Sequence, residues 1–351
     1  MKVLMIGVDK STQGGMWTVA ENFINEAEFC RKTNLKYMAT SITGSKLRRI
    51  LFTAESLLKI GLELARKKYD IVHVHMSEKG SVYRKNIVIN MARFFRCKVV
   101  LHMHGAEFEV WYRSLTLKRQ KGVRKIVDKA DKILILGYYW MDFIQSLVSE
   151  KSKVAILYNA VDIPRENQYN SSACHLLFLG AVCQRKGIYD LLQAINIVKE
   201  KLAENVKLWI YGPDVNNDIE EKISDFDLGK QVEYKGWLGA DERKEVFSEV
   251  SVNILPSYNE GLPMTILETM AYGIPNITTN VAAIPEAVND DNGVLIEPGD
   301  IDTLAKAILE FSGDMGIRKQ KSNAAYQTAK SKFCLQEHLA QMEKIYEDLI
   351  Q

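Results

Sequence analysis

The sequence alternates short apolar, largely β-branched runs with stretches of helical periodicity, and this alternation restarts in the second half of the chain. Continuous apolar strands separated by helices are typical of parallel sheets that helices cover on both faces. The expected strands are KVLMIGV, LKYMATS, DIVHVHM, KVVLHMH, DKILILG and KVAILYN, followed by HLLFLG, VKLWIYG, VEYKG, VSVNILP, PNITTN and GVLIEP. The pattern predicts an α/β fold with two Rossmann-like domains.

A polar segment with little apolar periodicity, DIPRENQYNSSA at Asp162 to Ala173, separates the two series and is predicted to be a linker. We expect one Rossmann-like domain over residues 1–165 and a second over residues 166–331. An amphipathic C-terminal helix within residues 332–351 is expected to cross the junction and pack back on the first domain. Ligands of such folds bind at the carboxyl ends of the strands, so two facing domains would form a binding cleft.

The net charge of +2 hides a division between the halves. Residues 1–165 hold 29 Lys+Arg and 15 Asp+Glu, a balance of +14, whereas the remainder holds 17 and 29, a balance of −12. A basic half suits an anionic partner such as membrane phospholipid, a phosphate-bearing acceptor or nucleic acid. Because no RNA- or DNA-binding module is recognisable, a nucleic-acid partner is not expected.

The sequence indicates a cytoplasmic protein. Its five cysteines are scattered without a C-x-x-C pair, which favours reduced, packed thiols. The opening MKVLMIGVDK reaches Asp9 before an apolar signal region can form, so we expect a first strand there and not a signal peptide. Two cationic segments, Ser45–Lys68 and Val110–Lys125, mix Lys and Arg with apolar groups. They are either ordinary surface helices or peripheral contacts with the anionic inner face of the plasma membrane.

Two loops have the composition of phosphate-binding turns. STQGGMW follows the first expected strand, and its Gly14 and Gly15 permit positive φ and close approach of the backbone to a ligand. The full G-x-G-x-x-G of nicotinamide sites is absent, so an ordinary turn is the alternative. FLGAVCQRKG places Arg185 and Lys186 before a helix that starts near Gly187. Cations beside free helix amides can form a diphosphate site, and a solvated basic turn is the alternative.

Histidines occur in two H-x-H patterns, at His73 and His75 and at His102 and His104. In a strand, each pair points to one face. The alternatives are metal ligands or histidines packed in the core, and a metal site would need a third ligand, which no recognisable spacing supplies. No metal is therefore expected. His104, at a strand end beside Gly105, is the better candidate for contact with a ligand.

Two carboxylates stand eight positions apart in PSYNEGLPMTILE, with Glu260 in a turn and Glu268 inside the next expected helix. Pro263 suits a first helical position, and the free amides near Met264 and Thr265 favour an anion. This spacing could place a sugar at Glu260, a nucleoside at Glu268 and a diphosphate between them. Alternatively, Glu260 merely stabilises the helix N-terminus.

Together, these segments resemble the retaining glycosyltransferases of family 4, which have the GT-B fold of two facing Rossmann-like domains. NEGLPMTILETMAYGIP resembles the E-x7-E signature, and the resemblance extends over nearly the whole chain. The other matching segments are FLGAVCQRKGIYDLLQAI, GWLGADERKEVFSEVSVNILPS, VAAIPEAVNDDNGVLIEPGD, YNAVDIP, the Gly14–Gly15 loop and HMHGAEFE.

The resemblance implies a role for each matching residue. Glu260 would contact the transferred sugar, Glu268 the ribose hydroxyls and Lys186 the diphosphate. His104 would contact the donor sugar or the reaction centre, as a catalytic residue with Glu260. The remaining donor-binding candidates are Gly14, Gly15, Arg185, Gly261, Leu262, Pro263, Met264 and Thr265.

The sequence departs from the family pattern in two places. Gly180–Ala181 stands where the family has Gly-Arg, so one diphosphate cation is missing and Arg185 is the candidate replacement. Ala282–Ala283 stands where the family has Gly-Gly, which would narrow the space near the nucleotide.

The implied activity is retaining transfer of a hexose-type sugar from a nucleotide diphosphate, with a UDP-sugar favoured over a GDP-sugar. The implied acceptor is a hydroxyl of a lipid-linked or other saccharide in bacterial surface polysaccharide synthesis, and no cofactor or metal is implied. Two alternatives remain: a sugar-nucleotide epimerase of the same two-domain shape, and a non-catalytic binding protein on a degenerate GT-B fold.

Overall fold

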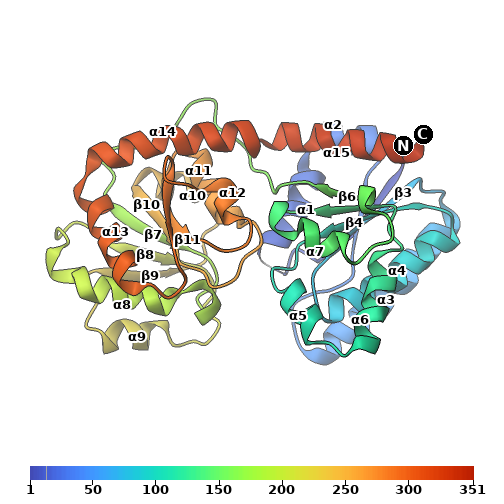
Figure 1. Ribbon diagram of the computed structural model, residues 1–351, viewed down its shortest axis with the longest axis horizontal. Helices are drawn as coiled ribbons and strands as arrows, with labels where there is room; N and C mark the ends of the chain where they lie inside the picture. The colour runs from blue at the N-terminus through green and yellow to red at the C-terminus, as the bar shows by residue number, and fades with distance from the viewer. Residues whose placement is uncertain (13) are drawn as a thin grey trace. The chain divides into compact units, whose positions relative to one another are not determined.

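The computed structural model describes residues 1–12 and 14–351, and the chain folds into two compact units. The first unit comprises Met1–Ala160 and Leu335–Gln351, and the second comprises Val161–Cys334. Each unit contains a six-stranded sheet flanked by helices (Figure 1). Neighbouring strands run parallel in both sheets, so the predicted α/β class is confirmed.

The sheet of the first unit has the strand order β2-β1-β3-β4-β5-β6. Its central strands are largely buried because helices cover both faces; all residues of β1 and β3 are buried, the polar His73 and His75 of β3 included. The strands are β1 (Val3–Gly7), β2 (Lys36–Ala39), β3 (Ile71–Met76), β4 (Lys98–Met103), β5 (Lys132–Ile135) and β6 (Val154–Ile156). The helices are α1 (Gly15–Asn25), α2 (Ala27–Thr33), α3 (Lys46–Arg66), α4 (Gly80–Phe94), α5 (Phe108–Ser114), α6 (Leu117–Val127), α7 (Met141–Gln145) and α15 (Leu335–Ile350).

Helix α15 packs within the first unit although it is the last element of the chain. Its buried residues recur at helical spacing and form one apolar stripe: Leu335, His338, Leu339, Met342 and Tyr346. It lies beside α2 (Figure 1), where Lys32 Nζ is 3.0 Å from Glu343 Oε2. The stripe explains why this helix joins the first sheet, since its apolar face is buried there.

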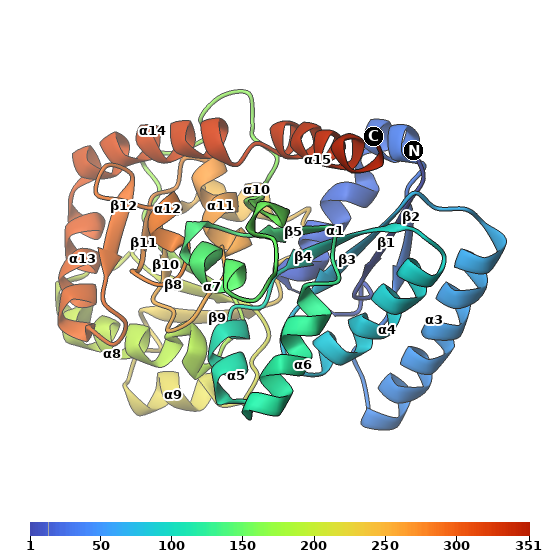
Figure 2. The ribbon, with the colours of Figure 1, turned by 45° about the vertical axis from the view of Figure 1, so that its right-hand side comes forward.

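The sheet of the second unit has the order β12-β11-β10-β7-β8-β9. Helices α8 and α13 lie side by side against it (Figure 2). The strands are β7 (His175–Leu179), β8 (Leu208–Tyr211), β9 (Val232–Gly236), β10 (Val250–Leu255), β11 (Asn276–Thr279) and β12 (Gly293–Ile296). The helices are α8 (Ile188–Val198), α9 (Ile219–Asp225), α10 (Arg243–Ser248), α11 (Met264–Ala271), α12 (Ile284–Ala287), α13 (Ile301–Gly313) and α14 (Met315–Lys332).

The segment predicted to be a linker is attached to the second unit by hydrogen bonds. Tyr326 Oη donates to Pro164 O at 2.7 Å, and Tyr169 Oη donates to Ser251 O at 2.9 Å. The chain therefore crosses from the first unit to the second between Ala160 and Val161, just before the polar segment. Among the described residues, no helix combines the length and apolar character that crossing a bilayer requires.

Candidate donor-binding site

The candidate site of the second unit forms where the central strands β7 and β10 end. These strands are parallel neighbours, so the loops that leave their carboxyl ends meet at one edge of the sheet. Tyr258 N donates to Arg185 O at 2.9 Å and joins the two loops. Gly187 has φ 73°, and a Cβ there would lie 2.0 Å from Pro256 O, so only glycine fits this close approach.

Glu260 is buried at this edge and is held by side chains from both loops. Its Oε1 accepts hydrogen bonds from Lys186 Nζ at 2.5 Å and from Ser257 Oγ at 2.7 Å. Arg185 Nη1 lies 3.9 Å from the other oxygen, Oε2, and donates to Asn259 O at 2.8 Å. The three predicted residues Arg185, Lys186 and Glu260 thus come together as one charged cluster.

The turn after Glu260 leads into α11. Pro263 has φ −64° and ψ 126°, so its backbone is extended, and the helix begins at Met264. The sequence predicted Pro263 as the first residue of this helix, but Pro263 lies one position before it. Because the first amides of a helix have no partner within it, the amides after Pro263 remain available to an anion.

Glu268 lies one turn into α11 and is largely buried, with 11% of its side chain exposed. Its Oε1 accepts a hydrogen bond from Arg243 Nη1 at 2.7 Å. Its Oε2 is buried and has no hydrogen-bond partner among the described residues. Burial raises the pKa of Glu268, and the Arg243 guanidinium opposes that rise. A buried carboxylate oxygen without a donor is a position where a ligand hydroxyl would be stabilised.

Sequence reasoning missed three members of this neighbourhood. Ser257 lies three residues before Glu260, and Arg243 comes from α10, 25 residues before Glu268. Tyr258 Oη donates to Asp190 Oδ2 at 2.6 Å and ties the turn to α8. Of these, Ser257 and Tyr258 carried a sequence signal, their closeness to Glu260, whereas Arg243 carried none.

The remaining candidates belong to the first unit. Gly14 precedes α1 with φ 133°, and Gly15 is the first residue of that helix; both are exposed. Gln13, in the same motif, lies outside the described residues. His104 follows β4 and is partly exposed, with its Nε2 2.8 Å from His75 Nδ1. Burial lowers the pKa of His104 to about 3, so its imidazole is neutral at neutral pH.

Ala282 shows how the chain departs from the Gly-Gly pattern. It adopts φ 50°, in the left-handed region where glycine is usual, and Ala283 begins the approach to α12. A Cβ in this conformation costs roughly 1–2 kcal/mol. The structure therefore retains the backbone shape expected of a glycine while adding a methyl group.

Comparison with known proteins identifies similar chains. Residues 173–314 match the model of the family described as glycosyl transferases group 1. An uncharacterized 41.2 kDa protein in the cps region of Klebsiella pneumoniae is 26% identical over 94% of this chain and 95% of its own length. A UDP-Gal:α-D-GlcNAc-diphosphoundecaprenol α-1,3-galactosyltransferase of Escherichia coli is 25% identical, over 84% of this chain and 80% of its own. The amylovoran biosynthesis glycosyltransferase AmsK of Erwinia amylovora is 23% identical, with coverages of 74% and 66%.

Solved structures agree on the fold. A sucrose-phosphate synthase from Thermosynechococcus elongatus has a TM-score of 0.83 at 16% identity, covering 99% of both chains. Anabaena Alr3699/HepE in complex with UDP-glucose has a TM-score of 0.79 at 13% identity, covering 99% of this chain and 100% of that one. The sequence match falls on the unit that carries the Lys186–Glu260 cluster. The chain is a glycosyltransferase of the GT-B fold, and its second unit carries the match to the glycosyl transferases group 1.

Proposed function

We propose that this enzyme is a retaining hexosyltransferase that uses a UDP-sugar and acts on a hydroxyl of a lipid-linked saccharide in bacterial surface polysaccharide synthesis. The observation that carries the proposal is the arrangement at the edge of the second sheet. Two cations converge on the buried Glu260, and the helix that follows presents a buried oxygen of Glu268 that has no hydrogen-bond partner within residues 1–12 and 14–351. This arrangement offers separate positions for a sugar, a diphosphate and a ribose.

In the proposed complex, the diphosphate lies against Lys186, Arg185 and the first amides of α11. Glu260, which Lys186 contacts in the absence of ligand, accepts a hydroxyl of the transferred sugar. The free Oε2 of Glu268 accepts a ribose hydroxyl, while Arg243 keeps hold of Oε1. The sugar end of the donor thus lies at Glu260 and its ribose at Glu268, eight positions later in the sequence.

The proposed reaction is a front-face displacement. The bond between the anomeric carbon and the diphosphate oxygen breaks, and a bond from the acceptor oxygen forms on the same face. The acceptor hydroxyl proton passes to the departing diphosphate, so the products are UDP and the extended saccharide. Lys186, Arg185 and the helix amides stabilise the negative charge that develops on the leaving group. The roles expected of Gly14, Gly15 and His104 in donor binding and catalysis are proposals that rest on the sequence resemblance.

The choice of donor and acceptor is supported by the names of the similar proteins. The relative from Escherichia coli is named for UDP-Gal and a diphosphoundecaprenol-linked acceptor, and the HepE structure contains UDP-glucose. The relative from Erwinia amylovora is named for amylovoran biosynthesis. A lipid-linked acceptor also suits the +14 balance of residues 1–165, since such a lipid is embedded in an anionic membrane.

Peripheral membrane contact is proposed for helix α3, which packs on α4 at the margin of the first unit (Figure 2). An exposed apolar stripe runs along it at helical spacing: Leu47, Leu51, Leu58 and Leu62, with Ile50 beside it. Arg48 and Arg49 are exposed on the same helix. An apolar stripe flanked by cations is the composition of helices that lie on anionic bilayers.

The enzyme should therefore sediment with vesicles that contain phosphatidylglycerol and not with pure phosphatidylcholine vesicles, and added salt should weaken the association. Charge reversal at four exposed cations, Arg48, Arg49, Lys118 and Arg119, should reduce the bound fraction at least tenfold, since each contributes about 1 kcal/mol near such a surface. Reversal at four exposed lysines of the second unit is the matched control and should leave binding unchanged: Lys201, Lys230, Lys244 and Lys319. Equal sedimentation with both vesicle types would contradict the proposed contact.

The proposed activity is tested by incubating the enzyme with UDP-glucose, UDP-galactose or UDP-N-acetylglucosamine, with and without a synthetic N-acetylglucosaminyl diphospholipid. The proposal predicts that UDP is released from one of these donors and that the release depends on the acceptor. Isomerisation of a UDP-sugar in the absence of acceptor would instead identify an epimerase. If UDP, GDP and ADP all fail to raise the melting temperature, the chain is a protein that has lost nucleotide binding.

A further inference from the structure

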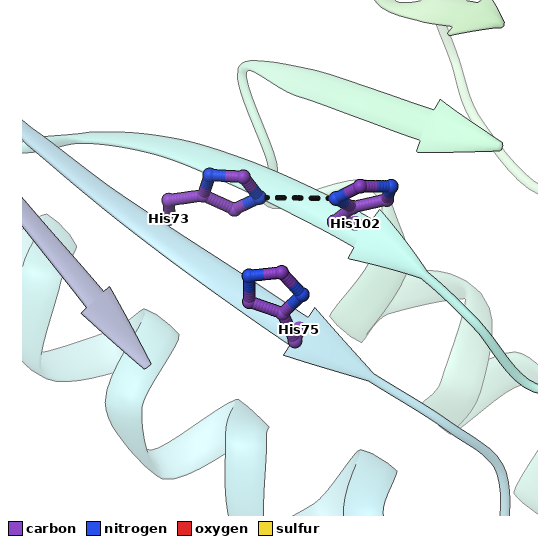
Figure 3. Close-up of side chains that lie close together, drawn as sticks. All are labelled: His73, His75 and His102. Carbon is purple, nitrogen blue, oxygen red and sulfur yellow. Dashed lines mark hydrogen bonds between the residues drawn. The ribbon is translucent and has the colours of Figure 1, made fainter. Parts of the chain in front are cut away.

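The core of the first unit contains a cluster of buried histidines: His73, His75 and His102. Strands β3 and β4 are parallel neighbours, and their register pairs His75 with His102. Because side chains alternate between the faces of a strand, His73 points to the same face as His75. The register thus brings His73 and His75 together with His102, which lies 29 positions after His73, in the buried core (Figure 3).

Three of these imidazoles have the spacing of metal ligands. One nitrogen from each of His73, His75 and His102 lies within 4.8 Å of the other two. His73 Nε2 and His102 Nδ1 are 3.3 Å apart, as Figure 3 shows by the dashed line. Two nitrogens bound to one tetrahedral Zn²⁺ at about 2.0–2.1 Å would be separated by roughly 3.3 Å. The separation of this pair therefore matches that of two ligands of one ion, and a nitrogen of His75 is close enough to complete a set of three.

The outer nitrogens of two rings are fixed by neighbouring side chains. His73 Nδ1 is 2.5 Å from the Tyr346 hydroxyl, and His75 Nδ1 is 2.8 Å from His104 Nε2. Metal-binding histidines characteristically use their second nitrogen in such contacts, which orient the ring. The Tyr346 contact comes from α15, so the C-terminal helix of the chain takes part in orienting the first ligand.

The hydrogen bonding of the cluster is incomplete without a further group. His73, His75 and His102 are fully buried, and Nε2 of His75 and Nε2 of His102 have no hydrogen-bond partner among the described residues. A buried polar atom without a partner costs about 1–3 kcal/mol. An apolar core would avoid this cost, whereas coordination of an ion through Nε2 of His75 would satisfy one of these two atoms.

We propose that His73, His75 and His102 bind one divalent transition-metal ion, with Zn²⁺ as the expected occupant, and that this ion fastens β3, β4 and α15 together. An all-imidazole ligand set suits Zn²⁺, Co²⁺, Ni²⁺ and Cu²⁺, whereas Mg²⁺ and Ca²⁺ require oxygen ligands. Water or hydroxide takes the fourth position of a three-histidine site, and hydroxide would offset part of the buried charge. The presence of the ion is tested independently of the proposed transfer reaction; His104, whose Nε2 is 2.8 Å from His75 Nδ1, is the proposed catalytic residue beside the site.

The test uses full-length protein without a histidine tag, produced in minimal medium supplemented with Zn²⁺ or with Co²⁺ and purified without chelator. Elemental analysis should find about one ion per chain. X-ray absorption of the zinc form should show the multiple-scattering signature of about three imidazoles at ~2.0–2.1 Å. A metal content below about a tenth of an ion per chain in both media, or a bound ion without imidazole ligands, would overturn the proposal.

The matched variants are His102→Phe and His338→Phe. His338 is another buried imidazole of the same core, with its Nδ1 2.8 Å from Tyr158 O, but it is not one of the three ligands. The metal content per chain should fall at least tenfold in His102→Phe and should stay unchanged in His338→Phe. Retention of the ion by His102→Phe, or its equal loss from both variants, would contradict the assignment. The X-ray absorption result on the unmodified protein decides the question even if a variant fails to fold.

Discussion

Replacing Glu260 with Gln should lower the turnover of sugar transfer by about 100-fold while changing the affinity for bare UDP by less than about threefold. The expected loss corresponds to roughly 2.7 kcal/mol of transition-state stabilisation, the effect of removing one well-placed polar group from an active site. Bare UDP lacks the sugar that Glu260 is proposed to contact, so its binding has little to lose. Steady-state kinetics with the full donor and calorimetric titration with UDP give the two quantities.

The Gln side chain preserves the shape of Glu260 and an oxygen that Ser257 Oγ and Lys186 Nζ can still reach. The melting temperature in the absence of ligand should therefore fall only slightly. If Glu260→Gln instead retains full transfer activity and loses stability, Glu260 serves the turn and the helix N-terminus, and the sugar contact is wrong.

Glu268→Gln is the counterpart at the other end of the donor. It should weaken the binding of bare UDP by about 10- to 100-fold, since hydrogen bonds to charged groups contribute roughly 1.5–3 kcal/mol. Burial raises the pKa of Glu268, so acidification should protonate this carboxylate at a higher pH than an exposed one and should weaken UDP binding. In the Glu268→Gln variant this acid-dependent loss should disappear. An unchanged UDP affinity in Glu268→Gln would remove Glu268 from the nucleotide site.

Lys186→Ala should weaken UDP binding by about 10- to 100-fold or more. The substitution removes a cation from the proposed diphosphate site, a loss of roughly 1.5–3 kcal/mol for a charged hydrogen bond. It also leaves the buried Glu260 carboxylate without its nearest counterion, because Arg185 Nη1 is 3.9 Å away. The uncompensated carboxylate would repel the diphosphate and add to the loss.

A double-mutant cycle separates these two effects. Combining Lys186→Ala with Glu260→Gln removes the uncompensated charge, so the double variant should bind UDP more tightly than Lys186→Ala alone. Arg185→Ala should weaken UDP binding to a similar extent as Lys186→Ala if Arg185 replaces the arginine that is absent at Ala181. Normal affinity in the Arg185 variant would show that the site works with one cation. No loss of affinity in either variant would place the diphosphate elsewhere.

The sequence was sufficient to predict the two parallel sheets because buried strands such as β1 and β7 read as short, mainly apolar runs separated by helical patterns. The family resemblance also assigned Lys186 and Glu260 to one donor site, and the structure brings these two side chains into contact. The Arg243–Glu268 ion pair could not be predicted, because it depends on how α10 and α11 are oriented against the sheet. The predicted start of α11 was wrong by one residue: the backbone of Pro263 is extended, so the helix begins at Met264.

The histidines show a more general limit. A third metal ligand was sought at a fixed spacing along the chain, and none was found near either H-x-H pattern. The structure offers a candidate third ligand through the parallel register that pairs His75 with His102, and this register depends on the sheet and not on local spacing. Residues that a parallel sheet brings together are separated by a whole crossover helix, here α4, and sequence spacing does not reveal them.

Retaining transfer from a UDP-sugar is tested most directly by determining the anomeric configuration of the first product by NMR. The enzyme is incubated with an α-linked UDP-hexose of the gluco or galacto series and the N-acetylglucosaminyl diphospholipid, and the signals of the new glycosidic linkage are recorded before secondary reactions occur. The account predicts a small coupling between H1 and H2 of the transferred sugar, which marks an α-linkage and retention. A large coupling, marking a β-linked product, would contradict the front-face displacement and the roles assigned to Glu260 and Lys186.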